Sequence, residues 1–281
     1  MKFVKYTAVL GAVLTVLGFG TAQAAKVNGG IWDGNMIQSQ SMVIPNVLSR
    51  QHFRREYRIP EDAYPGEWVD DNTLRFPAVN ELSLKLLRGN VTVITGKGEE
   101  ILVSCDSLKT RKNEMLFYQE DDELKLQIGN SEESAPSVTV VLPEGYRFQE
   151  VDLEIAAGSC NLLELTANEL KLQVAAGDAV IQNGKTAEAD FQCAAGAISY
   201  TGQIMDEADL DCTAGSIHLA LYQKEEDFNY EAEGTGGQIQ IGDTSLSGVV
   251  FQKELDHHAA SNMELQCAGG QIQIEFLENG I

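Results

Sequence analysis

Apolar and polar residues alternate along most of the chain from about residue 73, as in β-strands with one buried face. In the second half, apolar residues stand five and three positions before a recurring glycine, and again two and four positions after it. The first four of these glycines are spaced 19 residues apart, and two more follow insertions: Gly158, Gly177, Gly196, Gly215, Gly237 and Gly270. The period predicts an all-β, single-stranded β-solenoid, similar to a β-helix, with coils of about 19 residues.

The repeated glycines are expected to be structural bend residues. Each follows a segment such as Leu172-Gln-Val-Ala-Ala-Gly177 or Phe191-Gln-Cys-Ala-Ala-Gly196. Glycine with alanine neighbours suits a crowded bend in which a Cβ does not fit. One coil cannot bury its own apolar stripe, so stability depends on stacking. An antiparallel sandwich also alternates, but the fixed spacing favours the solenoid.

The pattern divides the chain into four parts. An N-terminal hydrophobic helix is followed by a polar linker or tether, by degenerate coils that cap the stack, and by the regular repeats. These parts are residues 1–25, 26–72, 73–150 and 151–281. The closing strand, Gln271–Phe276, is expected to leave an open edge, which Glu275 and Glu278 would blunt.

The first 25 residues indicate export. A basic start, Met1-Lys-Phe-Val-Lys5, precedes an apolar stretch and the ending Ala22-Gln-Ala24. This is typical of a secretory signal peptide, and a transmembrane anchor of marginal length is the alternative. Residues after the segment would be extracytoplasmic in both cases. The protein is then membrane-anchored, or secreted if the signal is cleaved near Ala24 or Ala25.

The charge of the chain is strongly negative. It has 42 acidic residues against 20 lysines and arginines, a net charge of −22. Residues 151–281 carry 22 acidic residues and only 4 lysines. Nucleic acid is therefore not an expected partner, because phosphate binding needs a basic surface. Basic peptides or divalent cations suit such a surface, although the simpler interpretation is a solvated face that keeps the protein soluble.

Two charged segments are candidates for contacts. A possible acidic contact face is formed by Asp206, Glu207, Asp209 and Asp211. A basic cluster, residues 50–58, lies in the tether and could touch an anionic lipid or wall polymer, or fold back on the acidic repeats.

The cysteines and histidines do not indicate a metal or redox site. Cys193 and Cys212 occupy the same inward position on successive coils, so a disulfide between them is geometrically possible. Ile155 and Val174 fill the equivalent position in earlier coils, so free buried thiols are favoured. His257 and His258 lie in an insertion and are expected to be loop residues. We predict no metal ligands and no cofactor.

No catalytic residues are predicted. Acids recur beyond the bends and turns, as in glycan-active β-helix enzymes, but no pair stands out. They are Asp178, Glu188, Asp190, Asp206, Glu207, Asp209 and Asp211. Phosphate-binding glycine loops, nucleophile elbows and zinc-protease motifs do not occur in the sequence.

The order of several segments resembles the putative-adhesin domain family. The segments are Leu142-Pro143, Val151-Asp-Leu-Glu-Ile-Ala-Ala-Gly158, the Ala-Ala-Gly coils, Asp227-Phe-Asn-Tyr230 and Cys267-Ala-Gly-Gly-Gln-Ile-Gln-Ile-Glu-Phe276. The resemblance covers about residues 75–281. It implies a repeat β-solenoid of bacterial, mostly Gram-positive, envelope proteins, which often follows one transmembrane helix. It implies a surface role and no established catalytic residues.

The favoured hypothesis is a non-catalytic, adhesin-like binding or scaffold module of the cell envelope, whose ligand is a protein, a glycan or a cationic peptide. The alternative is an envelope-stress component that binds cationic peptides or a membrane partner. A membrane contact through the N-terminal segment is expected if that segment is uncleaved. A polymer-forming solenoid and a glycan-active enzyme are less favoured.

Overall fold

The computed structural model describes residues 59–111, 114–129 and 135–277. The predicted signal or anchor and the basic cluster at 50–58 lie outside the described residues, as does most of the tether. Within the described ranges, no helix has the length and apolar character needed to span a membrane.

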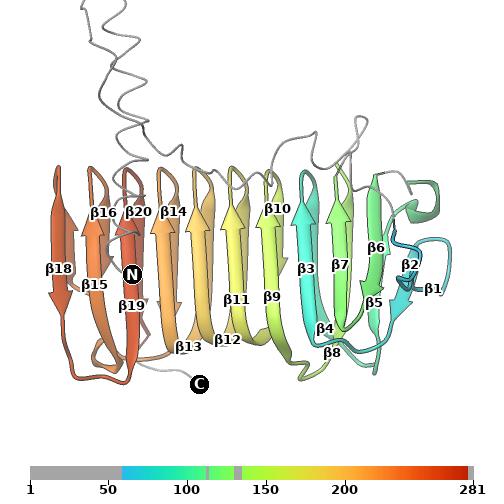
Figure 1. The fold of residues 1–281 in the computed structure, drawn as a ribbon, viewed down its shortest axis with the longest axis horizontal. Coiled ribbons are helices and arrows are strands. Elements are labelled where there is room, and N and C mark those ends of the chain that lie inside the picture. Colours follow the sequence, from blue (N-terminus) through green and yellow to red (C-terminus); the bar gives the residue numbers. More distant parts are fainter. Residues whose placement is uncertain (1–58, 112–113, 130–134, 278–281) are drawn as a thin grey trace, which may run out of the picture.

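The described chain is all-β and forms a stack of coils (Figure 1). Its first strands are β1 (Glu67–Trp68), β2 (Thr73–Phe76), β3 (Glu81–Leu86), β4 (Asn90–Gly96), β5 (Ile101–Cys105), β6 (Met115–Glu120), β7 (Glu123–Ile128), β8 (Ser137–Pro143), β9 (Phe148–Ile155) and β10 (Ser159–Leu162). The others are β11 (Leu165–Val174), β12 (Asp178–Cys193), β13 (Ala197–Cys212), β14 (Ser216–Leu221), β15 (Phe228–Gly234), β16 (Gln238–Ile241), β17 (Thr244–Ser247), β18 (Phe251–Leu255), β19 (Ser261–Cys267) and β20 (Gln271–Phe276). Two 3-10 turns, η2 (Leu108–Thr110) and η3 (Glu225–Asp227), interrupt them.

The stack has two faces, each a mostly parallel sheet. The first face runs, in spatial order, through β6, β7, β3, β9, β11, the second half of β12, the second half of β13, β19, β15 and β18 (Figure 1). The second face runs through β5, β8, β4, β10, the first half of β12, the first half of β13, β14, β20, β16 and β17. This arrangement is β-solenoid-like.

The sequence period appears directly in the strand register. Glu150 on β9 pairs with Glu169 on β11, which pairs with Glu188 on β12, which pairs with Glu207 on β13. Successive partners are therefore one coil apart. The positions predicted to face inward are buried, including a row formed by Leu153, Leu172, Phe191, Leu210 and Leu265. The predicted inward alternation is confirmed, and one continuous apolar core fills the stack.

The coil order at the C-terminal end differs from the sequence order. The last coil, β19 and β20, lies between the β13–β14 coil and the β15–β16 coil (Figure 1). The expectation that Gln271–Phe276 forms an open edge is therefore wrong. The outermost strands at that end are β18 and β17, which pair antiparallel with β15 and β16.

The spatial order of the coils also differs from their sequence order at the N-terminal end. The first coil, β3 and β4, lies between the β7–β8 coil and the β9–β10 coil. Antiparallel strands β6 and β5 then cover the outer coil, and β2 and β1 continue that layer. Both terminal coils thus have hydrogen-bonded neighbours on two sides, which should limit fraying of the chain ends.

The repeated glycines form a ladder at one bend of the stack. Their spatial order is Gly158, Gly177, Gly196, Gly215, Gly270 and Gly237, and Gly89 precedes them. A Cβ added to Gly196 would overlap the carbonyl oxygen of Gly177 and come 2.7 Å from Cγ1 of Val174. The amide of Ala197 donates to that same Gly177 carbonyl at 3.0 Å. Coils approach at the bend to backbone hydrogen-bonding distance, which leaves no room for a side chain.

Candidate functional site

The outward positions of the first face bring together acids that are far apart in sequence. The outermost of three rows consists, in spatial order, of Glu123, Glu81, Glu150, Glu169, Glu188, Glu207, Asn262 and Asn229. Neighbours in such a row are separated by the strand spacing of about 4.8 Å. Six glutamates are therefore held side by side by backbone pairing.

Lysines balance the N-terminal half of this face. Lys171 Nζ lies 2.7 Å from Glu150 and 2.8 Å from Glu169. Lys85 contacts Glu154 at 3.1 Å, and Lys125 lies between Glu120 and Glu123. The hydrogen bonds that the Lys171 ammonium donates to Glu150 and Glu169 raise the pKa of Lys171.

No lysine or arginine occupies the outward rows of the C-terminal half, from the second half of β12 to β18. We call the outward carboxylates there the acidic face. They are Glu188, Asp190, Glu207, Asp209, Asp211, Glu264, Glu231, Glu233 and Glu254. All nine are exposed or partly exposed. Burial raises the pKa of Glu233, and the nearby Glu231 and Glu264 raise it further.

Three of the four predicted contact residues belong to the acidic face. Glu207, Asp209 and Asp211 point outward from β13, and Asp206 is exposed beside them where the strand turns between the two faces. The acids that β15, β18 and β19 add to this face were not predicted. The outward alternation in those strands was visible, but their position beside β13 depends on the coil order.

The second face has a different chemistry. One of its outward rows consists of Thr139, Thr92, Asn161, Val180, Ser199, His218, Gln273, Gln240 and Ser245. None of these side chains is an acid, a lysine or an arginine. His218 lies 3.5 Å from Glu275. Asp178, another predicted outward acid, begins β12 on this second face. The C-terminal half of the stack therefore has many carboxylates on its first face and few charged side chains in this row of its second face.

The Asp152→Asn variant should be more stable than the wild type at neutral pH. Burial, and then the charge of Glu154, raises the pKa of Asp152 from 3.8 to about 6. Because the folded pKa exceeds the unfolded one, the folded state holds the proton more tightly, and stability falls as pH rises from about 4 to about 6. Asparagine removes this dependence. Its advantage should grow through that window and level off near 1 kcal/mol after solvent screening.

Urea unfolding of both proteins between about pH 4 and pH 8 measures this difference. An advantage of the same size at every pH would show that Asp152 acts through packing rather than through its ionisation.

The cysteines lie inside the stack. All five are free and buried. Cys193, Cys212 and Cys267 form an in-register row, so the predicted Cys193–Cys212 adjacency gains a third member. Hydrogen bonds to Cys193 and Cys267, together with burial, raise the pKa of the Cys212 thiol. The Cys212 sulfur would lie 2.6 Å from a Cβ at Gly270, so these thiols fill the space under the bend glycines.

His257 and His258 lie in the loop between β18 and β19, as predicted. His257 Nδ1 lies 2.9 Å from the carbonyl oxygen of Phe228, whereas His258 contacts Asp256. The two rings thus have different partners. In the described part of the chain, no group of three or more His, Cys, Asp or Glu side chains is arranged to hold a metal ion.

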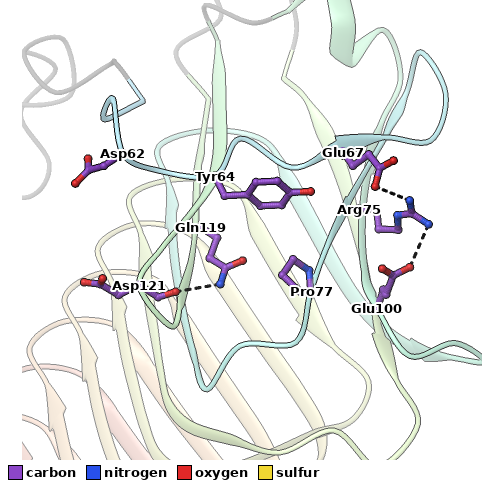
Figure 2. Close-up of a pocket in the computed structure, with 8 residues that line it drawn as sticks. All are labelled: Asp62, Tyr64, Glu67, Arg75, Pro77, Glu100, Gln119 and Asp121. Atoms are coloured by element: carbon purple, nitrogen blue, oxygen red, sulfur yellow. Dashed lines mark hydrogen bonds and ion pairs between the residues drawn. The ribbon is translucent and has the colours of Figure 1, made fainter.

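A pocket of about 380 Å³ lies in the N-terminal cap, among strands that the repeat pattern did not reach (Figure 2). It is lined by Asp62, Tyr64, Glu67, Arg75, Pro77, Glu100, Gln119 and Asp121. Backbone hydrogen bonds of 2.8 Å in both directions join Tyr64 to Gln119 on β6, which fixes the wall. The pocket was not predicted from the sequence, because its residues come from four separate segments without a shared motif.

Stacked parallel coils with two flat outward faces define an all-β, β-solenoid-like protein. The model of the Toastrack DUF4097 family matches residues 79–276, and the chain belongs to this family. The match confirms the resemblance to the putative-adhesin domain family. No curated protein matches the sequence.

Several solved structures are similar at low sequence identity. A putative cell adhesion protein from Clostridium sporogenes is 13% identical, with a TM-score of 0.40, and the match covers 74% of this chain and 100% of that one. A putative adhesin from Bacteroides fragilis is 13% identical, with a TM-score of 0.31 and coverage of 75% and 100%. A putative lipid binding protein from Parabacteroides distasonis is 12% identical, with a TM-score of 0.35 and coverage of 73% and 97%.

Proposed function

We propose that the protein is a non-catalytic, adhesin-like binding and scaffold module of the bacterial cell envelope. It would act outside the cytoplasm, tethered by its N-terminal hydrophobic segment or released by cleavage. The observation that carries the proposal is the pair of flat, regular outward faces over an interior filled by apolar side chains. A rigid sheet face offers a partner many contacts at little cost in conformational entropy.

A more specific role is favoured by the acidic face. Nine carboxylates attract cations in a part of the face where the outward rows contain no lysine or arginine, and their repulsion is relieved when a cationic partner binds. A basic peptide or the cationic surface of an envelope partner fits this chemistry. The proposal therefore includes capture of cationic peptides through the first face.

Neutralising part of this face should weaken binding of a basic peptide. We expect the variant Asp206→Asn, Glu207→Gln, Asp209→Asn and Asp211→Asn to bind an oligolysine peptide roughly tenfold more weakly than the wild type, because each exposed pair contributes a few tenths of a kcal/mol or more. Wild-type affinity should fall steeply as salt is added. Isothermal titration calorimetry at several salt concentrations measures both effects.

The matched control removes four exposed acids that lie on turns, by Glu99→Gln, Glu144→Gln, Glu164→Gln and Asp243→Asn. It has the same net charge as the test variant. Equal losses in the two variants would assign the attraction to net charge rather than to the acidic face. If the wild type binds neither basic peptides nor wall glycans nor host surfaces, the binding role itself is wrong and the protein is a spacer.

A further inference from the structure

Neutral polar side chains form a continuous stripe along the second face. The row that contains Thr139 continues to Ser104 on β5 and then to Thr73 on β2, so it crosses eleven strands from β2 to β17. At a strand spacing of about 4.8 Å, the row is about 48 Å long. A second outward row lies two residues away along each strand from β8 to β17, and we call the two rows together the polar stripe. The second row is Ser137, Asn90, Ser159, Asp178, Ala197, Ser216, Gln271, Gln238 and Ser247.

The polar stripe carries almost no charge in a strongly charged protein. Of its 20 positions, 16 have a hydroxyl or an amide, and Asp178 is the only acid, lysine or arginine among them. Charged residues make up 22% of the chain, so 20 positions taken at random would contain about four, and exposed positions more. A face that only keeps a protein soluble normally carries charges, as the first face does. Solubility alone therefore does not explain the composition of the stripe.

The polar groups of the stripe are available to a ligand. All 20 residues are exposed or partly exposed. In the described part of the chain, the side chains of Thr92, Asn161 and Ser199, near the middle of the stripe, have no hydrogen-bond partner. The Ser159 hydroxyl donates to the Asn90 side-chain oxygen at 2.8 Å, which leaves the Asn90 amide hydrogens facing outward as donors. Hydroxyl and amide groups together offer donors and acceptors, here at positions fixed by a rigid sheet.

This chemistry selects among possible ligands. The net charge of −22 repels an anionic polymer, and a basic peptide meets no row of carboxylates on this face. An apolar partner would meet only Val180 and Ala197. Sugar hydroxyls donate and accept as the stripe does, and they carry no charge. Both the charge and the hydrogen-bonding groups of the stripe are therefore complementary to a neutral glycan, and an extended chain reaches several strands at once.

We propose that the polar stripe binds an uncharged glycan chain that lies across the strands, with Thr92, Asn161 and Ser199 among its hydrogen-bonding contacts. The inference rests on the proposed binding role of the protein and names the ligand of its second face. It does not depend on binding of cations at the acidic face, which lies on the first face.

The test is a ligand-observed NMR titration of the full chain with three neutral hexasaccharides: cellohexaose, maltohexaose and chitohexaose. We expect at least one of them to bind, and its disaccharide to bind at least about tenfold more weakly, because the shorter chain makes fewer hydrogen bonds. Added salt should change this affinity little, since no ion pairs form. A hexamer of galacturonic acid, which carries a carboxylate on each sugar, should bind at least about tenfold more weakly than the best neutral hexamer at low salt.

The double variant Asn161→Ala and Gln271→Ala should lose at least about fivefold in affinity for the hexasaccharide that binds, because it removes two hydrogen-bonding groups from the stripe. The matched control, Gln173→Ala with Gln252→Ala, removes two outward amides from the first face and should bind as the wild type does. Both variants keep the net charge of the wild type. Circular dichroism spectra verify the fold of both.

The proposal is overturned if none of the three neutral hexamers binds, or if the double variant and its control weaken binding equally. It is also overturned if the galacturonic acid hexamer binds as well as the neutral one. Sedimentation that shows a wild-type dimer, lost in the double variant, would assign the stripe to a second copy of the chain instead. Failure here with retained binding of oligolysine by the acidic face would leave the proposed function standing, whereas loss of both would contradict the binding role itself.

Discussion

Replacing Gly196 by alanine should destabilise the protein by about 3 kcal/mol, the upper end of the range for overpacked sites. A Cβ at this position would overlap the Gly177 carbonyl oxygen and approach Val174, and the same carbonyl accepts the amide of Ala197. The two coils must move apart to remove this steric overlap, which weakens hydrogen bonds on both sides of the bend. The free energy of urea unfolding, followed by circular dichroism, measures the effect.

Gly98→Ala is the matched control. It makes the same chemical change, but a Cβ there has no atom within 4 Å, and its φ lies outside the left-handed region. We expect a change of less than about 0.5 kcal/mol, as at ordinary surface positions. If Gly196→Ala is as mild as this control, the bend has room to relax, and the close approach of coils does not explain the glycine repeat.

Removing one complete coil should leave a folded, shorter stack. Deletion of residues 172–190 joins Lys171 to Phe191, which pairs in register with Leu172 in the intact protein. Every later residue keeps its face, and Phe191 meets Leu153 in place of Leu172. Because repeat stability is roughly a sum of coil and interface contributions, we expect a lower but still cooperative unfolding transition.

Deleting one residue more should abolish cooperative folding. Removal of residues 172–191 joins Lys171 to Gln192, so that Gln192 falls on an inward position and Cys193 on an outward one. A one-residue slip moves alternate side chains to the wrong face. Thermal melts and binding of a hydrophobic dye distinguish the two deletions. A cooperative melt in both would show that a bulge absorbs the slip, and a non-cooperative melt in both would show that the coils are not interchangeable.

The inward residues could be predicted because their pattern is local. Leu153, Leu172 and Phe191 occupy equivalent positions relative to a glycine, and all three are buried in one row. A sheet with one apolar face buries alternate residues, so the periodicity within a single coil is enough to predict which residues face inward. The bend glycines are readable for the same reason, since each coil must turn at the same place.

The candidate sites were predicted only in part. Asp209 and Asp211 could be assigned to an outward face from their own strand, but Glu264 and Glu231 join them only because β19 and β15 pack next to β13 in that order. The cap pocket was missed entirely. Its residues, such as Tyr64 and Gln119, meet through an isolated antiparallel bridge between segments more than fifty residues apart.

By itself, the sequence determined the strands, the coil period, the inward faces and the excess of negative charge. These properties follow from residue spacing within one coil, where covalent geometry fixes which side chains share a face. The tertiary structure alone decided which coils are neighbours. The β19–β20 coil and the β15–β16 coil have the same apolar pattern, so either could stack on β13, and side-chain contacts across coils select one. The Ser261 hydroxyl of β19, for example, donates to the carbonyl of Met205 on β13 at 2.6 Å. Such contacts join residues that are distant in sequence, and no local pattern encodes them.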